Sequence, residues 1–280
     1  MTQLSNPLRA FFRQPAIYLK LPSNGSFWSE DSVDFPQNRE LPVYPMTAVD
    51  EITYRTPDAL FSGQSVINVI HSCVPNIKNA WSAPFIDINS ILIGIRIASY
   101  GHNMEVSTKC PHCQNEDDYG MDLRMMLERM KAPDYSMPVA AGDLEIFFKP
   151  MTYKNLNDNN HRQFEEQKIL ETLPGVEMPN EQRMSALSAA LMKITEITVH
   201  ALSQSIAAVK TPDALVSDPE HIEDMLKHCD RRLFAKIRDH IVNIKSQAEI
   251  QPMTLKCAAC EKDYQQAVTL DMTSFFEDAS

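Results

Sequence analysis

Four of the six cysteines fall in two matching C-x-x-C pairs, which is the spacing of a metal knuckle. The pairs are Cys110 with Cys113 and Cys257 with Cys260. A lysine precedes each pair, Lys109 and Lys256, and a predicted strand flanks each pair on both sides. Four thiolates fill the tetrahedral shell that structural Zn²⁺ prefers and leave no open position for a reacting water. The spacing therefore predicts a split zinc ribbon whose metal folds the protein. Free thiols or a redox disulfide are the alternatives.

The other residues that could take part in catalysis or binding are better explained by structural roles. Adjacent acidic pairs rarely converge on a substrate, so we interpret them as helix caps or solvated surface. These pairs are Asp50-Glu51, Asp117-Asp118 and Glu165-Glu166. Cys73 and Cys229 fall on apolar helical stripes, as core thiols do. Met125, Met126 and Met130 either grip a partner or pack in the core. We predict no catalytic residue and no enzyme, because the eight histidines lack a catalytic motif.

Composition excludes several classes of protein. The 280 residues carry a formal net charge of -11, and the basic residues are scattered, so a nucleic-acid-binding surface is not expected. With only 7 glycines, the chain has no phosphate-binding G-x-G-x-x-G. No apolar run is long enough to span a bilayer, and the N-terminus does not read as a signal peptide. We expect a protein made in a cytoplasm.

The elements before the first cysteine pair change from extended to helical. Residues 1–57 are rich in proline and aromatic side chains, which predicts an extended arm with strands near 16–21 and 41–46. A helix should begin at Pro57, with an apolar stripe of Leu60, Val66, Val69, Ile70 and Cys73. Asp87 should cap a second, almost entirely apolar helix that ends near Gly101.

The rest of the chain reads as a helical insertion into the metal module. Strands are expected at 105–109, 119–123, 144–148, 253–256 and 264–270. Helices should fill 153–250, with one stripe from Leu187 to Ile206 and another from Ile222 to Ile241 after the cap Asp218, paired as an antiparallel hairpin. The predicted fold class is α+β: a small β zinc-ribbon module interrupted by a largely helical insertion, with an extended N-terminal arm. We expect four parts: the extended arm at 1–57, a helical segment with the first knuckle at 58–121, the mainly helical insertion at 122–250, and the second knuckle with a C-terminal strand at 251–280.

Several segments resemble the baseplate hub and hub-assembly proteins of T-even-like contractile-tailed bacteriophages. They are PAIYLKLPSNG at 15–25, VYPMTAVDE at 43–51, RIASYG at 96–101 leading into CPHC at 110–113, KPMTY at 149–153, and TLD at 269–271 with SFF at 274–276. This resemblance implies a non-enzymatic virion or assembly component. It would bind other tail proteins and lie in the baseplate, or in the host cytoplasm during assembly. A place in a tail ring would give three- or six-fold copy number.

A nucleic-acid-binding zinc ribbon is the main alternative function. Such a ribbon needs basic strands, whereas acidic residues follow both knuckles. They are Glu116, Asp117, Asp118 and Asp122 after the first, and Glu261 and Asp263 after the second. The charge pattern therefore favours protein partners.

Overall fold

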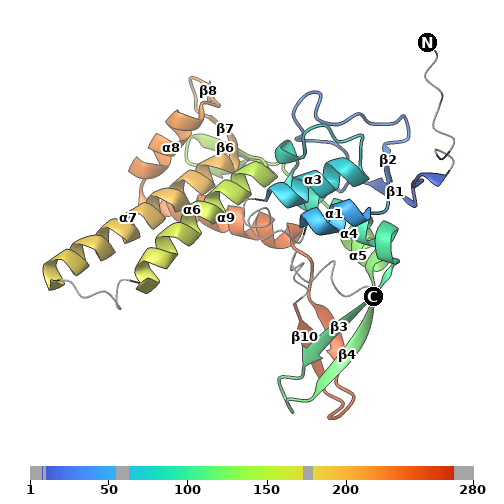
Figure 1. Ribbon diagram of the computed structural model, residues 1–280. Helices are drawn as coiled ribbons and strands as arrows, with labels where there is room; N and C mark the ends of the chain where they lie inside the picture. The colour runs from blue at the N-terminus through green and yellow to red at the C-terminus, as the bar shows by residue number, and fades with distance from the viewer. Residues whose placement is uncertain (1–7, 9–10, 55–62, 173–178, 268–280) are drawn as a thin grey trace.

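The computed structural model describes residues 8, 11–54, 63–172 and 179–267. This part of the chain combines helices with small antiparallel sheets, as the predicted α+β class requires. Figure 1 shows a part with the N-terminal strands, a part with the two longest helices, and two β-hairpins that project from the body. The division at residues 57, 121 and 250 stays a prediction.

The first hydrophobic core surrounds the apolar helix α4. Its elements are β1 (Ile17–Lys20), β2 (Glu40–Val43), α1 (Ala48–Tyr54), α3 (Gln64–Cys73), η2 (Ala80–Ser82), α4 (Phe85–Tyr100) and α5 (Leu123–Arg129). Ile88, Ile91 and Ile95 of α4 are all buried, as expected for a helix that is apolar on every side. In α3 the predicted stripe is confirmed, because Val66, Val69, Ile70 and Cys73 are buried. The predicted start at Pro57 and the first stripe residue, Leu60, lie outside the described residues.

The proline-rich N-terminal segment lies against this core. β1 and β2 form an antiparallel pair in which Ile17 faces Val43. Leu19 of β1 and Leu41 of β2 are buried on one side of the pair. Leu19 approaches Gly94 of α4 so closely that an added Cβ there would lie 3.3 Å from its Cδ2 atom. This close approach explains a glycine in the middle of a helix.

Asp87 does not cap α4 as predicted. The helix begins at Phe85 after Pro84, and Asp87 is fully buried in its first turn. The Asp87 carboxylate accepts hydrogen bonds from the Ser23 backbone N–H at 3.0 Å, from the Ser23 hydroxyl, and from Trp28 Nε1 at 2.7 Å. Asp87 therefore ties the N-terminal loop to α4. The predicted end of the helix at Gly101 is confirmed, with φ 89° and a bond from its N–H to the Ile97 carbonyl.

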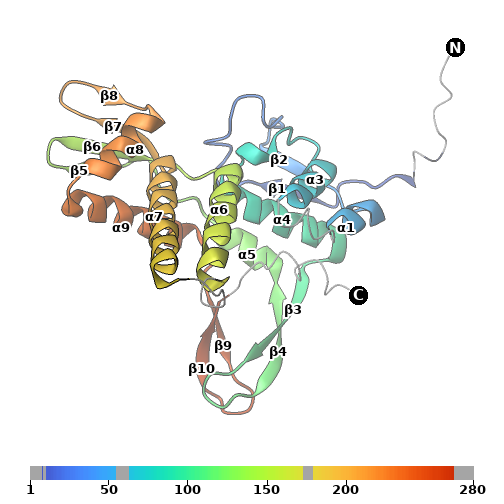
Figure 2. The ribbon, with the colours of Figure 1, turned by 60° about the vertical axis from the view of Figure 1, so that its left-hand side comes forward.

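The second core lies between a four-stranded sheet and helices. Its sheet has the order β5 (Val139–Ala141), β6 (Leu144–Phe148), β7 (Ile206–Lys210), β8 (Leu215–Val216). Its helices are α7 (Asn180–Gln204), α8 (Pro219–His228) and α9 (Arg231–Ala248), and α6 (Tyr153–Thr172) lies beside α7 (Figure 2). Ile146, Phe148, Ile222 and Ile237 are buried there. The predicted strand at 144–148 is confirmed.

Three details of the helical prediction were wrong. Ile206 begins strand β7 instead of ending the helical stripe, so a β-hairpin rather than a short loop joins α7 to α8. The second stripe is broken into α8 and α9, because Asp230 caps a new helix by accepting bonds from the N–H groups of Arg232 and Leu233. The strand predicted to end at Leu123 ends at Asp122 instead, and Asp122 caps helix α5, which begins at Leu123. Asp218 caps α8 as predicted.

None of the helices within the described residues combines the length and apolar character needed to cross a membrane.

Candidate metal centre

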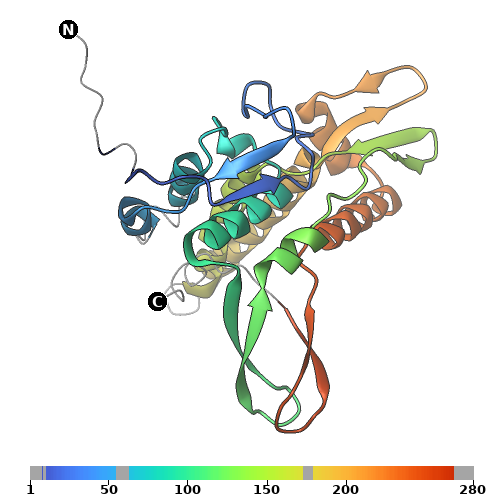
Figure 3. The ribbon, with the colours of Figure 1, turned by 90° about the vertical axis from the view of Figure 1, so that its right-hand side faces the viewer.

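Two β-hairpins from opposite ends of the insertion carry the four cysteines. The first pairs β3 (Asn103–Lys109) with β4 (Glu116–Asp122), and the second pairs β9 (Met253–Lys256) with β10 (Asp263–Gln266). They project side by side from the body with their turns together (Figures 2 and 3). The strands flanking both pairs lie where predicted but have different ends: β3 begins at Asn103, β4 spans Glu116–Asp122 and β10 spans Asp263–Gln266. The end predicted at Leu270 lies outside the described residues.

The two turns have the same backbone conformation. In the first, the Gln114 N–H donates to the Cys110 carbonyl and the Cys110 N–H donates to the Asn115 carbonyl, both at 2.9 Å. In the second, the Glu261 N–H bonds the Cys257 carbonyl at 2.9 Å, and the Cys257 N–H bonds the Lys262 carbonyl at 3.0 Å.

The fifth residue of each turn, Gln114 or Glu261, adopts a positive φ, of 64° and 57° respectively. This left-handed conformation is unusual for residues other than glycine. Two identical turns thus present two thiols each in the same way.

The four thiols meet in one cluster. All four Sγ atoms lie within 4.8 Å of one another. Across the hairpins, Cys110 Sγ lies 3.7 Å from Cys260 Sγ, and Cys113 Sγ lies 3.6 Å from Cys257 Sγ. A disulfide requires about 2.05 Å between sulfurs, so these thiols are not bonded to each other. A tetrahedral zinc with four sulfurs at about 2.3 Å has sulfur–sulfur edges of about 3.8 Å, which the observed separations fit.

Hydrogen bonds and neighbouring thiols shift the pKa values of Cys113 and Cys257 in opposite directions. Backbone N–H groups of Cys260 and Ala259 lower the pKa of Cys257 to about 7. The Asn115 N–H lowers the pKa of Cys113, but desolvation and the three neighbouring thiols raise it to about 12. Neighbouring thiolates repel one another, so a cation is needed to hold all four in the deprotonated form. The cluster could therefore hold a metal ion.

Contacts between the hairpins hold the cluster in place. The Tyr119 hydroxyl of β4 donates to the Lys256 carbonyl at 3.0 Å, and the Thr108 and Tyr264 hydroxyls are hydrogen-bonded. The rings of Tyr119 and Tyr264 meet edge to face, with centroids 6.4 Å apart. Cys110, Leu255, Cys257 and Tyr264 form a small core of their own. The β3–β4 hairpin and the β9–β10 hairpin thus make one module, although they are far apart in the sequence.

The surface of this module is acidic. Glu116 and Asp118 on the first hairpin and Glu261 and Asp263 on the second are exposed. Glu116 pairs with Lys109 at 3.2 Å, which neutralises one of the few basic groups. His112 is exposed at the turn and lies outside the four-sulfur cluster.

The acidic pairs singled out in the sequence have structural partners. Asp50 accepts bonds from the N–H and hydroxyl of Thr47 at the start of α1, as a helix cap does, and Arg13 lies 3.3 Å away. Glu166 pairs with Lys193 on the neighbouring helix. Cys73 is a buried core thiol, and burial raises its pKa to about 12, which removes nucleophilic character at neutral pH.

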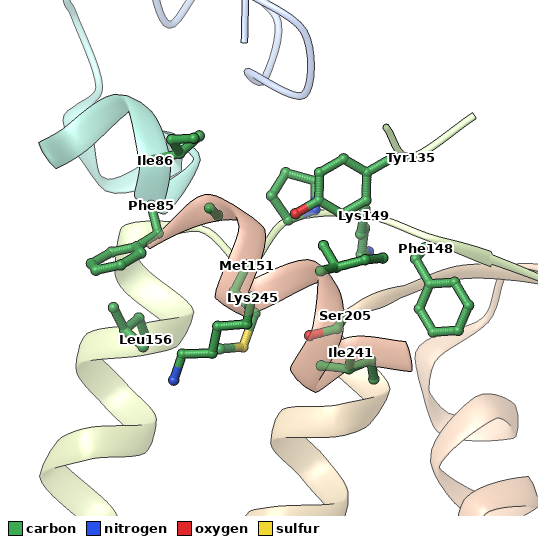
Figure 4. Close-up of a pocket in the computed structure, with 13 residues that line it drawn as sticks. Phe85, Ile86, Tyr135, Phe148, Lys149, Met151, Leu156, Ser205, Ile241 and Lys245 are labelled. Carbon is green, nitrogen blue, oxygen red and sulfur yellow. The ribbon is translucent and has the colours of Figure 1, made fainter. Parts of the chain in front are cut away.

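A separate apolar cavity lies at the seam between the two cores (Figure 4). It has a volume of about 80 Å³, and its lining includes Phe85, Phe148, Met151 and Ile241. Burial raises the pKa of Tyr135 at its edge to about 12, so this hydroxyl is no base at neutral pH. Among the residues that the structure describes, the lining has neither a carboxylate nor a histidine, and the sequence offered no signal for this cavity.

A comparison with protein families relates nearly the whole chain to one family. A sequence model described as T4 bacteriophage base plate protein matches residues 18–277. No curated protein and no solved structure matches the chain. The matched range includes both hairpins, the helices between them and both cores. The resemblance noted in the sequence is thereby confirmed at the level of the family, and the chain belongs to the T4 bacteriophage base plate protein family.

Proposed function

We propose that this chain is a non-enzymatic structural component of a phage tail baseplate. It lies in the hub region, binds other tail proteins, and is present in the virion or in the host cytoplasm during assembly. The family match over residues 18–277 is the observation that carries this proposal. If the protein forms part of a ring in the tail, its copy number follows the symmetry of that ring, three or six.

The surface supports protein partners. Large apolar side chains are exposed on the paired helices α6 and α7, including Phe164, Leu191 and Met192. Exposed apolar side chains on one pair of helices can form part of a surface that contacts other proteins. The acidic residues around both knuckles disfavour a phosphate backbone, so the nucleic-acid-binding alternative gains no support.

We also propose that Cys110, Cys113, Cys257 and Cys260 bind one structural zinc ion. Their sulfur separations fit a tetrahedral ZnS₄ shell, and two identical turns present them. Four protein ligands fill that shell, so the ion's contribution is to hold the two hairpins together. The contacts of Tyr119 with Lys256 and Tyr264 hold the same two hairpins together beside the cluster.

Phage assembly provides the test. Phage that lack this chain are complemented with plasmid-borne versions, and infectious titre and tail morphology are measured. The double variant Cys110→Ser/Cys257→Ser should fail to restore tails. Cys229→Ser should restore them, because Cys229 lies outside the four-sulfur cluster. Normal tails assembled in the complete absence of the chain would overturn the baseplate role, whereas rescue by the double variant would overturn the role of the metal.

A further inference from the structure

The apolar cavity at the seam between the two cores has walls that backbone hydrogen bonds hold in place. The Phe85 N–H, at the start of α4, donates to the Met151 carbonyl at 3.1 Å. The Lys149 N–H, just after β6, donates to the Ser205 carbonyl at 2.9 Å. All four of these residues line the cavity. The cavity is therefore formed before any ligand binds, as most binding pockets are.

The lining runs from an apolar floor to a charged rim. Phe148 of β6 and Ile244 of α9 are buried, whereas Lys149 and Lys245 are exposed. Figure 4 shows side chains of α4, α6 and α9 around the space, among them Leu156 and Lys245. Because exposed residues belong to the lining, a ligand can enter from solvent.

The polar side chains of the lining offer donors. A lysine ammonium group donates hydrogen bonds and accepts none. Within the described residues, neither Lys149 nor Lys245 forms an ion pair with a carboxylate, and the Tyr135 hydroxyl forms no hydrogen bond. The Ser205 hydroxyl already donates to the Ala201 carbonyl at 3.4 Å. A ligand that carries carboxylates beside an apolar group therefore complements this lining in charge.

The volume limits the apolar part of such a ligand. The cavity measures about 80 Å³. An apolar protein cavity of about 150 Å³ holds one benzene molecule. A single aliphatic side chain therefore suits this space, whereas a long acyl chain does not. Single apolar side chains that fill a pocket are typical anchors of protein interfaces.

We propose that the seam cavity receives one leucine-sized side chain from an acidic segment of a partner protein, whose carboxylates bind Lys149 and Lys245. That the partner is a tail protein rests on the proposed function. The lining comes from α4 of the first core and from β6 and α9 of the second. The bound side chain thus contacts both cores at once.

Methyl NMR of the full-length protein tests the proposal. Met151 lies in the lining, and Met184 and Met192, 63% and 64% exposed on α7, give reference signals. The probe is an acetylated tetrapeptide amide of one leucine and three glutamates. Its titration should shift the Met151 methyl signal to saturation and leave the reference signals in place. Alanine in place of leucine should weaken binding at least about tenfold, because most of the buried apolar surface is lost.

Charge reversal at the rim tests the two lysines. Lys149→Glu/Lys245→Glu should weaken peptide binding by about tenfold, because two attractions become repulsions. The matched control is Lys20→Glu/Lys168→Glu, which changes the net charge equally at exposed lysines outside the lining. This control should bind the peptide as the wild type does. Circular dichroism verifies that both variants remain folded.

Several results would overturn the proposal. They are an unmoved Met151 signal at millimolar peptide, equal binding of the alanine peptide or of a peptide with lysines in place of glutamates, and equal weakening in the two lysine variants. Tighter binding of octanoate than of the peptide would assign the cavity to a small amphiphile and would also overturn it. The titration needs no phage, so its failure leaves the baseplate role intact. Normal tails without this chain would instead overturn that role and leave the titration unchanged.

Discussion

Replacing Asp87 with asparagine tests how the N-terminal segment is fixed to the first core. The carboxylate offers two acceptor oxygens: Oδ1 accepts from the Ser23 N–H, and Oδ2 accepts from Trp28 Nε1 and the Ser23 hydroxyl. An amide of the same shape keeps one acceptor oxygen and replaces the other by a donor. In either orientation, an N–H of Ser23 or Trp28 then faces an NH₂ group.

The expected loss follows from two opposing terms. A hydrogen bond to a charged group contributes about 1.5–3 kcal/mol, and at least one such bond is lost. Burial raises the pKa of Asp87, while the hydrogen bonds from Ser23 and Trp28 lower it, so a neutral side chain recovers part of the cost of burying the charge. We expect a net loss of about 2 kcal/mol in the free energy of unfolding. For a chain of this size, the melting temperature should fall by roughly 4–8 °C.

Urea denaturation followed by circular dichroism measures the loss. Asp34→Asn is the matched control, because Asp34 makes an exposed ion pair with Lys78 at 3.0 Å. Its cost should stay below about 1 kcal/mol. An Asp87→Asn protein as stable as wild type would refute the reasoning, since the three bonds would then contribute nothing beyond the cost of burial.

Two further substitutions concern the second core and its helices. Ile237→Ala should lower the free energy of unfolding by about 3 kcal/mol, because Ile237 is fully buried. The control Val242→Ala, on the exposed side of α9, should lower it by less than about 0.5 kcal/mol. Equal losses in urea denaturation would contradict the assignment of the core. Hydrogen bonds from His200 and Lys227 hold the pKa of Glu223 below its usual range, so this carboxylate stabilises the fold above its ordinary pKa and loses that effect as the pH falls through the lowered value. Glu223→Gln should therefore flatten part of the acid dependence of the melting temperature below about pH 4.5, and an unchanged slope there would contradict it.

Features that depend on neighbouring residues in the chain were predictable. The apolar run of α4 specifies a buried helix, and the alternation from Leu144 to Phe148 specifies a strand. Asp218 followed by proline specifies the start of α8. The two C-x-x-C pairs pointed to one cluster because matched ligand pairs are needed to complete a metal shell.

Features that depend on distant residues could not be predicted. Asp87 has the type and position of a helix cap, and only its contacts with Ser23 and Trp28 give it another role. Ile206 continues the helical spacing of α7 but pairs with Phe148 in the sheet. Tertiary context outweighs local periodicity at such positions. The break between α8 and α9 did have a local signal, the cap Asp230, which the longer apolar stripe obscured.

The groove lined by Met121, Met125, Met126, Met130, Ile250 and Met253 shows the same limit. The sequence left Met125, Met126 and Met130 open between core packing and partner binding. In the fold Met126 is buried in the first core, while Met125 is exposed at the groove. Adjacent residues of one short helix thus face different surroundings, and the groove exists only because the segment after α9 lies opposite α5.

Metal content is the most direct test of the central claim that four cysteines hold the two hairpins together. Purified protein is analysed for zinc, and its thermal unfolding is followed with and without a chelator. We predict about one zinc per chain, lost in Cys110→Ser/Cys257→Ser, and a large fall in melting temperature when the metal is removed. Protein that contains no zinc and melts at the same temperature with and without chelator would contradict the claim.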